Sequence, residues 1–203
     1  QLSVIAIVTI CTIACSTNIP MSTSLDDELV YDLEVNDSIP IVFKLENQLT
    51  SGSFFQYEKG DGNVLYPVED EMVYNEYVVL TQMLNDFMRY RFANTSGSEP
   101  AQIDMGLKWV TISSEATEND QATTLNSLLF IHGTRLYTAE VRVEVIITHK
   151  GQTHKRTIYG RANTRAETFK KTKTDVNAYS AVLNKANNRV VYFTNQFLRD
   201  VGL

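Results

Sequence analysis

Two alternating segments, separated by only four residues, constrain the fold of this chain most strongly. Residues 137–149 and 154–163 place apolar side chains at every second position, with polar ones between them. A period of two is typical of β-strands that bury one face and expose the other. The connecting residues 150–153 include a glycine and are few enough for a tight turn. The sequence therefore predicts a β-hairpin with one buried face.

The residues of the turn determine which side chains face each other across this hairpin. We expect Gly151 and Gln152 to be the two central residues of the turn. The expected facing pairs are His149–His154, Val145–Ile158, Val143–Gly160 and Val141–Ala162. Gly160 and Ala162 have small side chains, so we expect a helix to cross the buried face closely at this point.

Two long segments with helical periodicity supply the layer that covers the hairpin. Residues 71–92 and 175–200 carry apolar side chains at spacings of three and four, which is typical of a helix with one buried face. Three acidic residues at 69–71 favour the start of the first helix, because the helix dipole is positive there. Gly202 follows the second helix, where glycine commonly ends a helix.

Shorter segments predict the remaining strands. Residues 39–45 and 103–112 alternate apolar and polar side chains, and the second segment is expected to place Ile103, Met105, Leu107 and Trp109 on one face of a strand. The glycine-rich segment 60–63 favours a hairpin turn with a short return strand over 63–68. The main elements follow the order β-α-β-β-β-α. We therefore expect an α+β two-layer domain over residues 38–203, with an antiparallel sheet of about four strands and two long helices on one face.

The first residues form an apolar, uncharged run that ends at a cysteine. Residues 2–14 are too few to cross a bilayer but fit the hydrophobic region of a signal peptide. Thr12-Ile13-Ala14-Cys15 resembles a bacterial lipobox, in which a small residue precedes a cysteine that is diacylated before the leader is removed. We expect residues 1–14 to be a partial signal peptide and residues 15–37 to be a lipidated N-terminus and tether.

A lipidated Cys15 would attach the domain stably, because two acyl chains hold a protein at a membrane where one holds it only marginally. Ser16 follows the cysteine, and no aspartate stands there as an inner-membrane retention signal. By resemblance to enterobacterial sorting, this indicates the outer membrane, with the domain facing the periplasm. The other interpretation is an ordinary cleaved signal peptide in which Cys15 is incidental.

Several of these features together resemble one family of bacterial lipoproteins. They are Cys15, the segment Asn63-Val64-Leu65-Tyr66-Pro67 that runs into the first helix, the central strand, the hairpin ending in Tyr159-Gly160-Arg161-Ala162-Asn163, and the long C-terminal helix. In this combination the chain resembles the YajG family of uncharacterised Gram-negative lipoproteins. The resemblance implies a lipid-anchored envelope domain, and the family supplies no catalytic residues.

The sequence contains no motif of a known catalytic or metal site. His132, His149 and His154 have no metal-ligand spacing, and no nucleophile elbow or phosphate-binding glycine loop is present. The two cysteines are Cys11 and Cys15, so a mature chain that starts at Cys15 has no free thiol for catalysis. We expect no catalytic residue, no metal and no cofactor. A hydrolase remains the rival interpretation and requires a pocket with convergent titratable side chains.

Basic side chains are frequent between residues 142 and 173. In the expected register Arg142 lies opposite Arg161, and such a like-charge pair is unfavourable unless an anion relieves it. The candidate anion-binding residues are therefore Arg142, Lys155, Arg156 and Arg161. The other interpretation is a solvated face on which Glu140 and Glu144 neutralise the arginines.

Together these observations predict a non-catalytic binding or adaptor module of the cell envelope, held at the membrane by its lipid anchor and bound to an unidentified envelope protein. The alternative is an accessory lipoprotein of lipid or lipopolysaccharide assembly or transport that binds an anionic lipid. That alternative needs an apolar cleft or a basic anion site. A net charge of -6 argues against a nucleic-acid partner.

Overall fold

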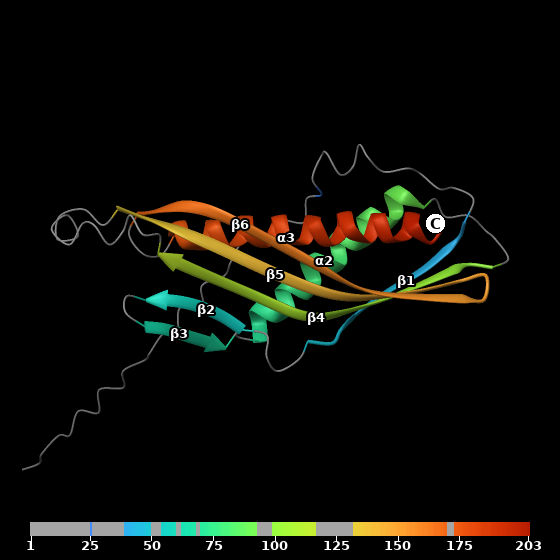
Figure 1. Ribbon diagram of the computed structural model, residues 1–203, viewed down its shortest axis with the longest axis horizontal. Helices are drawn as coiled ribbons and strands as arrows, with labels where there is room; N and C mark the ends of the chain where they lie inside the picture. Colours follow the sequence, from blue (N-terminus) through green and yellow to red (C-terminus); the bar gives the residue numbers. More distant parts are fainter. Residues whose placement is uncertain are drawn as a thin grey trace, which may run out of the picture.

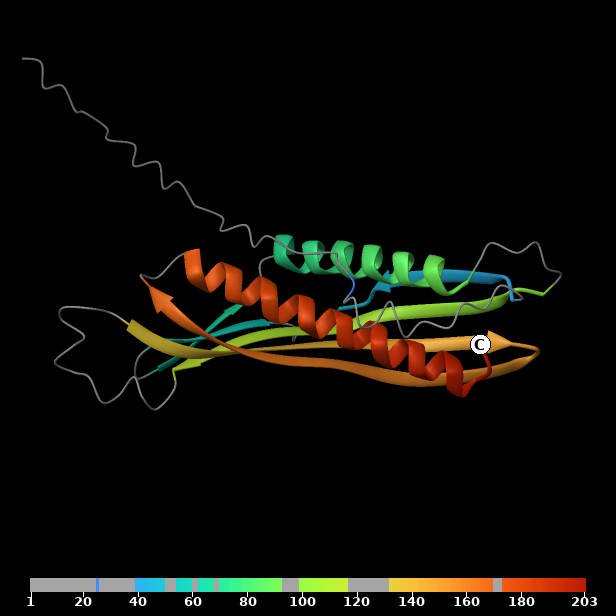
Figure 2. The same ribbon diagram turned by 90° about the horizontal axis from the view of Figure 1, so that it is seen from above.

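The computed structural model describes residue 25 and residues 39–49, 54–59, 62–67, 70–92, 99–116, 132–169 and 173–203. In this part of the chain, a six-stranded sheet carries two long helices on one side (Figures 1 and 2). The strands are β1 (Ile41–Asn47), β2 (Phe54–Lys59), β3 (Gly62–Pro67), β4 (Ala101–Ala116), β5 (His132–His149) and β6 (Gln152–Phe169), and the helices are α2 (Asp70–Arg91) and α3 (Lys173–Asp200). The predicted α+β two-layer fold is confirmed.

The sheet differs from the predicted one in strand number and direction. Its order is β3-β2-β4-β5-β6, and β1 also pairs with β4. Both β1 and β2 run parallel to β4, whereas the other neighbours are antiparallel. Parallel neighbours need a long crossover connection, usually a helix. Helix α2 lies in the chain between β3 and β4 and provides this crossover, which is why the sheet is mixed.

The β5–β6 hairpin is present, but its register differs from the prediction by two residues. Lys150 and Gly151 form the turn, with φ angles of 50° and 73°. Positive φ at both central residues is the geometry that matches the twist of the flanking strands, and glycine at the second position accepts it without a steric penalty. His149 therefore pairs with Gln152 instead of the predicted His154.

The shift changes which residues face each other but leaves each side chain on its predicted face, because the side-chain period of a strand is two. The apolar residues of β5 and β6 face the helices as predicted. The other three predicted pairs are wrong: Val143 faces Ile158, Val141 faces Gly160, and Ala139 faces Ala162. The predicted Arg142–Arg161 pair is also wrong, because Arg142 lies opposite Tyr159 and Arg161 lies opposite Glu140.

A β-bulge in β4 moves one predicted core residue to the opposite face. The register with β5 shifts between Leu107 and Trp109, so Lys108 is an extra residue. Leu107 is fully buried, and Val110 continues the buried row after the bulge. The sequence predicted Trp109 on the same face as Leu107, and this is wrong, because the inserted residue inverts the alternation at that point.

The core lies between the helices and the sheet, and a helix approaches the sheet closely at Gly160 on β6. A Cβ atom there would lie 2.1 Å from the main-chain oxygen of Ala186 and 2.7 Å from Cγ2 of Val190. Both neighbours belong to α3, and Ala186 and Val190 are fully buried. The predicted close crossing of a helix over Gly160 is confirmed.

The N-terminal predictions fall almost entirely outside the described residues. The signal peptide, Cys15 and most of the tether lie there. Leu25 is the described residue of the predicted tether, and its partly buried side chain packs against the hydrophobic core. At this point the segment therefore contacts the domain.

The close contact at Gly160 predicts a large loss of stability when a methyl group is added. We expect Gly160→Ala to lower the free energy of unfolding by about 3 kcal/mol, because main-chain atoms of α3 must move. Gly106→Ala is the matched control: its Cβ would meet the flexible side chain of Gln48 at 2.5 Å, which can move away. Urea denaturation measures both changes, and similar losses in the two variants would contradict this account of the helix contact.

Candidate functional site on the uncovered sheet face

The side of the sheet that faces away from the helices carries mainly polar residues. We call it the uncovered face. On β5, the odd-numbered residues from Tyr137 to Ile147 are fully buried, whereas the even-numbered ones between them are partly or fully exposed. The uncovered face is therefore where side chains of β1, β4, β5 and β6 are available to a ligand or partner.

Two arginines and two aromatic residues form a layered stack across this face. The Arg142 guanidinium carbon lies 5.6 Å from the centre of the Trp109 ring and 5.0 Å from that of Tyr159. The Arg161 guanidinium lies 5.4 Å from the same Tyr159 ring. Each contact has the geometry of a cation–π interaction. We call these four residues, contributed by β4, β5 and β6, the arginine–aromatic stack.

A single carboxylate serves both arginines of the stack. Arg161 Nε donates to one oxygen of Glu140 at 2.6 Å, and Arg142 Nη2 donates to the other at 3.1 Å. Glu140 is the least exposed of the three, with a side chain 19% accessible, against 37% for Arg142 and 66% for Arg161. Two positive charges share one negative charge, so the stack keeps a net positive charge and an exposed guanidinium.

A second polar group follows β1, β4, β5 and β6 nearer the hairpin turn. It consists of Lys44, Glu46, Gln48, Lys108, Glu144 and Lys155. Glu144 accepts from Lys155 at 2.9 Å and lies 3.6 Å from the Lys108 ammonium. Hydrogen bonding to Lys155 is the main reason why the pKa of Glu144 lies below its ordinary value. The carboxylate of Glu144 is therefore charged at neutral pH, with Lys155 and Lys108 beside it.

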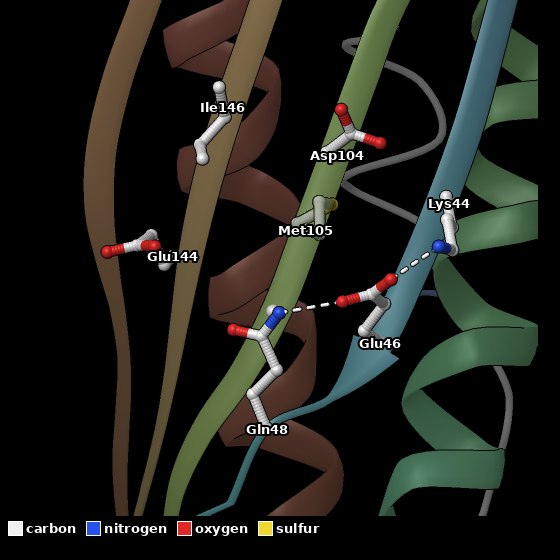
Figure 3. Close-up of a pocket in the computed structure, with 8 residues that line it drawn as sticks. Lys44, Glu46, Gln48, Asp104, Met105, Glu144 and Ile146 are labelled. Atoms are coloured by element: carbon white, nitrogen blue, oxygen red, sulfur yellow. Dashed lines mark hydrogen bonds and ion pairs between the residues drawn. The ribbon is translucent and has the colours of Figure 1, made fainter.

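A shallow hollow of about 350 Å³ lies beside this group, where Gly106 leaves β4 without a side chain. Figure 3 shows Gln48 extending over β4 toward Glu46, which in turn contacts Lys44. The amide of Gln48 donates to Glu46 at 2.8 Å and accepts from Lys108. The Gln48 side chain thus fills part of the space above Gly106. The remaining lining is both charged and apolar: Lys44, Glu46, Asp104, Met105, Glu144 and Ile146.

The four predicted anion-binding residues do not form one site. Arg142, Lys155 and Arg161 lie on the uncovered face, and each contacts a glutamate of β5. Arg156 contacts α3 on the other side, where it pairs with Asp200 at 2.8 Å and lies over the Phe197 ring at 4.4 Å. Sequence reasoning missed Trp109 as a partner of the arginines, because no signal in the sequence reveals the bulge that turns it.

The described residues contain no group of three or more side chains with the spacing to hold a metal ion. His149 and His154 are not paired across the hairpin, so the predicted facing of these two imidazoles is wrong. Within the described part of the chain, neither helix is long and apolar enough to cross a bilayer.

A carboxylate side chain is buried away from this face. Glu76 on α2 is 2% exposed, and no regular hydrogen bond satisfies its carboxylate among the described residues. Burial raises the pKa of Glu76 to about 8, and the adjacent Asn187 side chain of α3 opposes this only in part. Glu76 is therefore mostly protonated at neutral pH, which avoids a buried charge between the helices.

Comparison with known proteins assigns no family to this chain. The sequence matches no family model and no curated protein. Among solved structures, it is similar to one described as an uncharacterized protein, at 12% sequence identity and a TM-score of 0.38. That match covers 82% of this chain and 95% of the other. The resemblance to the YajG family stays a prediction.

The raised pKa of Glu76 predicts that the protein loses stability as the pH rises. The folded state holds a proton up to a pH of about 8, whereas the unfolded state releases it near 4.5. Between these values the free energy of unfolding should fall by about 1.4 kcal/mol per pH unit. We expect Glu76→Gln to remove this slope in urea denaturation measured at several pH values.

Glu144→Gln is the matched control for this experiment. The pKa of Glu144 is lowered, so its contribution to stability changes only below the ordinary carboxylate range, outside the window of Glu76. The slope should persist in Glu144→Gln. If Glu76→Gln retains the full slope as well, another group is responsible and the proposed protonation of Glu76 is wrong.

Proposed function

We propose that this chain is a lipid-anchored, non-catalytic binding module of the bacterial cell envelope, attached to the membrane through Cys15. The lipobox-like sequence Thr12-Ile13-Ala14-Cys15 supports the anchor, and the resemblance to the YajG family supports the envelope location. Ser16 supports the outer membrane, with the domain facing the periplasm. The domain then binds an envelope protein with its uncovered face.

The arginine–aromatic stack is the observation that carries the binding role. Tryptophan, tyrosine and arginine are the residue types that contribute most to protein–protein binding energy. In the stack, each arginine is held between rings or against Glu140, so little side-chain entropy remains to be lost on binding. Tyr159 lies at the centre of the stack and is 42% exposed, although large aromatic side chains are usually at least partly buried.

The charge of the stack indicates the chemistry of its partner. Arg142 and Arg161 carry two positive charges, and Glu140 supplies one negative charge between them. The whole chain has a net charge of -6. A local positive site on an acidic protein attracts an acidic partner surface to this point, and the negative charge of the rest of the protein repels that surface elsewhere. The same charge would serve the alternative function, in which the stack binds the phosphate of an anionic lipid.

The anchor is tested by the intact mass of the mature protein from separated membranes. We expect wild-type protein in the outer-membrane fraction with a mass increment of lipid size on Cys15, because diacylation provides stable attachment. Cys15→Ala should lose the increment and leave the membrane. Cys11→Ala is the control and should keep both properties. Wild-type protein that is soluble and unmodified would contradict the proposed anchor.

The binding surface is tested by in-cell photocrosslinking. A photoreactive residue in place of Tyr159 should give a discrete protein adduct, because the stack would lie inside the interface. The same residue in place of Tyr90 is the control, since Tyr90 is 58% exposed on α2 of the helix layer. Adding Arg161→Glu should greatly reduce the Tyr159 adduct. Equal adducts at both positions, or adducts with lipid alone, would contradict a protein partner at the stack.

A further inference from the structure

Strand β6 forms a long border of the sheet. It spans 18 residues, and among the described residues no strand pairs with its outer edge (Figure 1). In an antiparallel pair, alternate residues direct both main-chain groups toward the partner strand or away from it. His149 and Gln152 flank the two-residue turn and therefore form a hydrogen-bonded pair. The odd-numbered residues of β6 thus direct their N–H and C=O groups outward.

A side chain of α3 confirms this direction. Arg189 Nη1 donates a hydrogen bond to the main-chain oxygen of Arg161, an odd-numbered residue. The helix therefore reaches the edge of β6 from above, with a side chain that occupies one outward carbonyl. Unpaired main-chain groups of an edge strand are a template for another strand, and a charged side chain is one device that limits such pairing.

Two aromatic side chains of α3, Tyr192 and Phe193, lie on the side of the helix that carries Arg189. Phe193 lies four residues after Arg189 on α3, so both side chains project from the same side of the helix. Phe193 is 40% exposed, and its ring contacts Tyr192 edge-on with ring centres 5.3 Å apart. A strand added to β6 would direct every second side chain toward the helix layer, where this aromatic pair favours an apolar residue.

The charges of β6 select against a second copy of this chain and in favour of an acidic segment. From residue 152 to residue 166, where its side chains are described, every charged residue of β6 is basic: Lys155, Arg156, Arg161 and Arg165. Pairing with the same strand of a second molecule would place these positive charges near one another, which is destabilising. An added strand with acidic side chains on the uncovered face would instead lie beside Arg161 and Arg165.

We propose that a partner protein binds by adding a strand to the outer edge of β6, through an extended segment in which acidic and apolar residues alternate. The main-chain hydrogen bonds supply affinity in this mode, and the alternate side chains supply specificity. This inference rests on the proposed binding function and specifies how it works at the same site, because Tyr159 and Arg161 of the arginine–aromatic stack belong to β6.

The test uses the full chain and a synthetic peptide of about seven residues in which valine and glutamate alternate, long enough for one strand. We expect fluorescence anisotropy to detect binding and amide hydrogen exchange to slow by about tenfold at Thr157, Tyr159 and Asn163, whose N–H groups point outward. A lysine–valine peptide of the same length is the control for charge. A glutamate–valine peptide with N-methylated alternate amides is the control for main-chain pairing, and neither control should bind.

A variant pair tests the edge from the side of the protein. Asn163→Pro removes an outward N–H and leaves the β5–β6 hydrogen bonds in place, because proline is tolerated at such positions of an edge strand. It should weaken binding of the glutamate–valine peptide by about tenfold. Asn163→Ala keeps the N–H and should bind like wild type. If Asn163→Pro does not fold, the N-methylated peptide still gives the answer.

The outcomes separate this proposal from the proposed function. No binding of the glutamate–valine peptide, equal binding of its N-methylated form, or unchanged amide exchange would overturn strand addition. Binding that Arg161→Glu abolishes but N-methylation leaves intact would overturn strand addition while the arginine–aromatic stack remains a binding site. A soluble, unmodified protein in the mass experiment would overturn the anchor and leave the edge unaffected.

Discussion

The close contact of α3 with β6 at Gly160 determines much of the rest of the structure. Because no side chain stands at Gly160, the main chain at Ala186 lies directly on the strand. The helix then covers the apolar residues of β5 and β6. Its outer side reaches the edge of β6, where Arg189 donates a hydrogen bond to the Arg161 carbonyl. A side chain at Gly160 would raise the helix and expose core on both strands.

On the uncovered face of the sheet, the arrangement of side chains depends mainly on electrostatic interactions. The register between β5 and β6 is decisive there, because it determines which charged side chains face each other. The turn at Lys150 and Gly151 places Glu140 opposite Arg161 and Tyr159 opposite Arg142. A turn one residue later would have set the two arginines opposite each other, at a cost in repulsion. The observed register satisfies the turn geometry and the charges together.

Periodicity in the sequence predicted the helices, the hairpin and the buried faces of β5 and β6, since burial repeats with the geometry of the element. It did not predict the register, because a shift of two residues keeps every side chain on its face. The bulge at Lys108 was equally hidden, so Trp109 was assigned to the core. The burial of Glu76 between the helices also escaped prediction, because a glutamate in a helix is most often exposed.

The pairing of nearly all charges on the uncovered face has a consequence for binding. An acidic partner that docks at Arg161 competes with Glu140, so its charge adds less affinity than a free arginine would offer. Among the described residues, Arg189 competes for the main-chain groups on the outer edge of β6 at the Arg161 carbonyl. Affinity then comes from the strand edge and selectivity from the basic side chains. Such a division suits the proposed membrane-tethered module, because an anchor would raise the local concentration of a partner at the same membrane and weak contacts would then suffice.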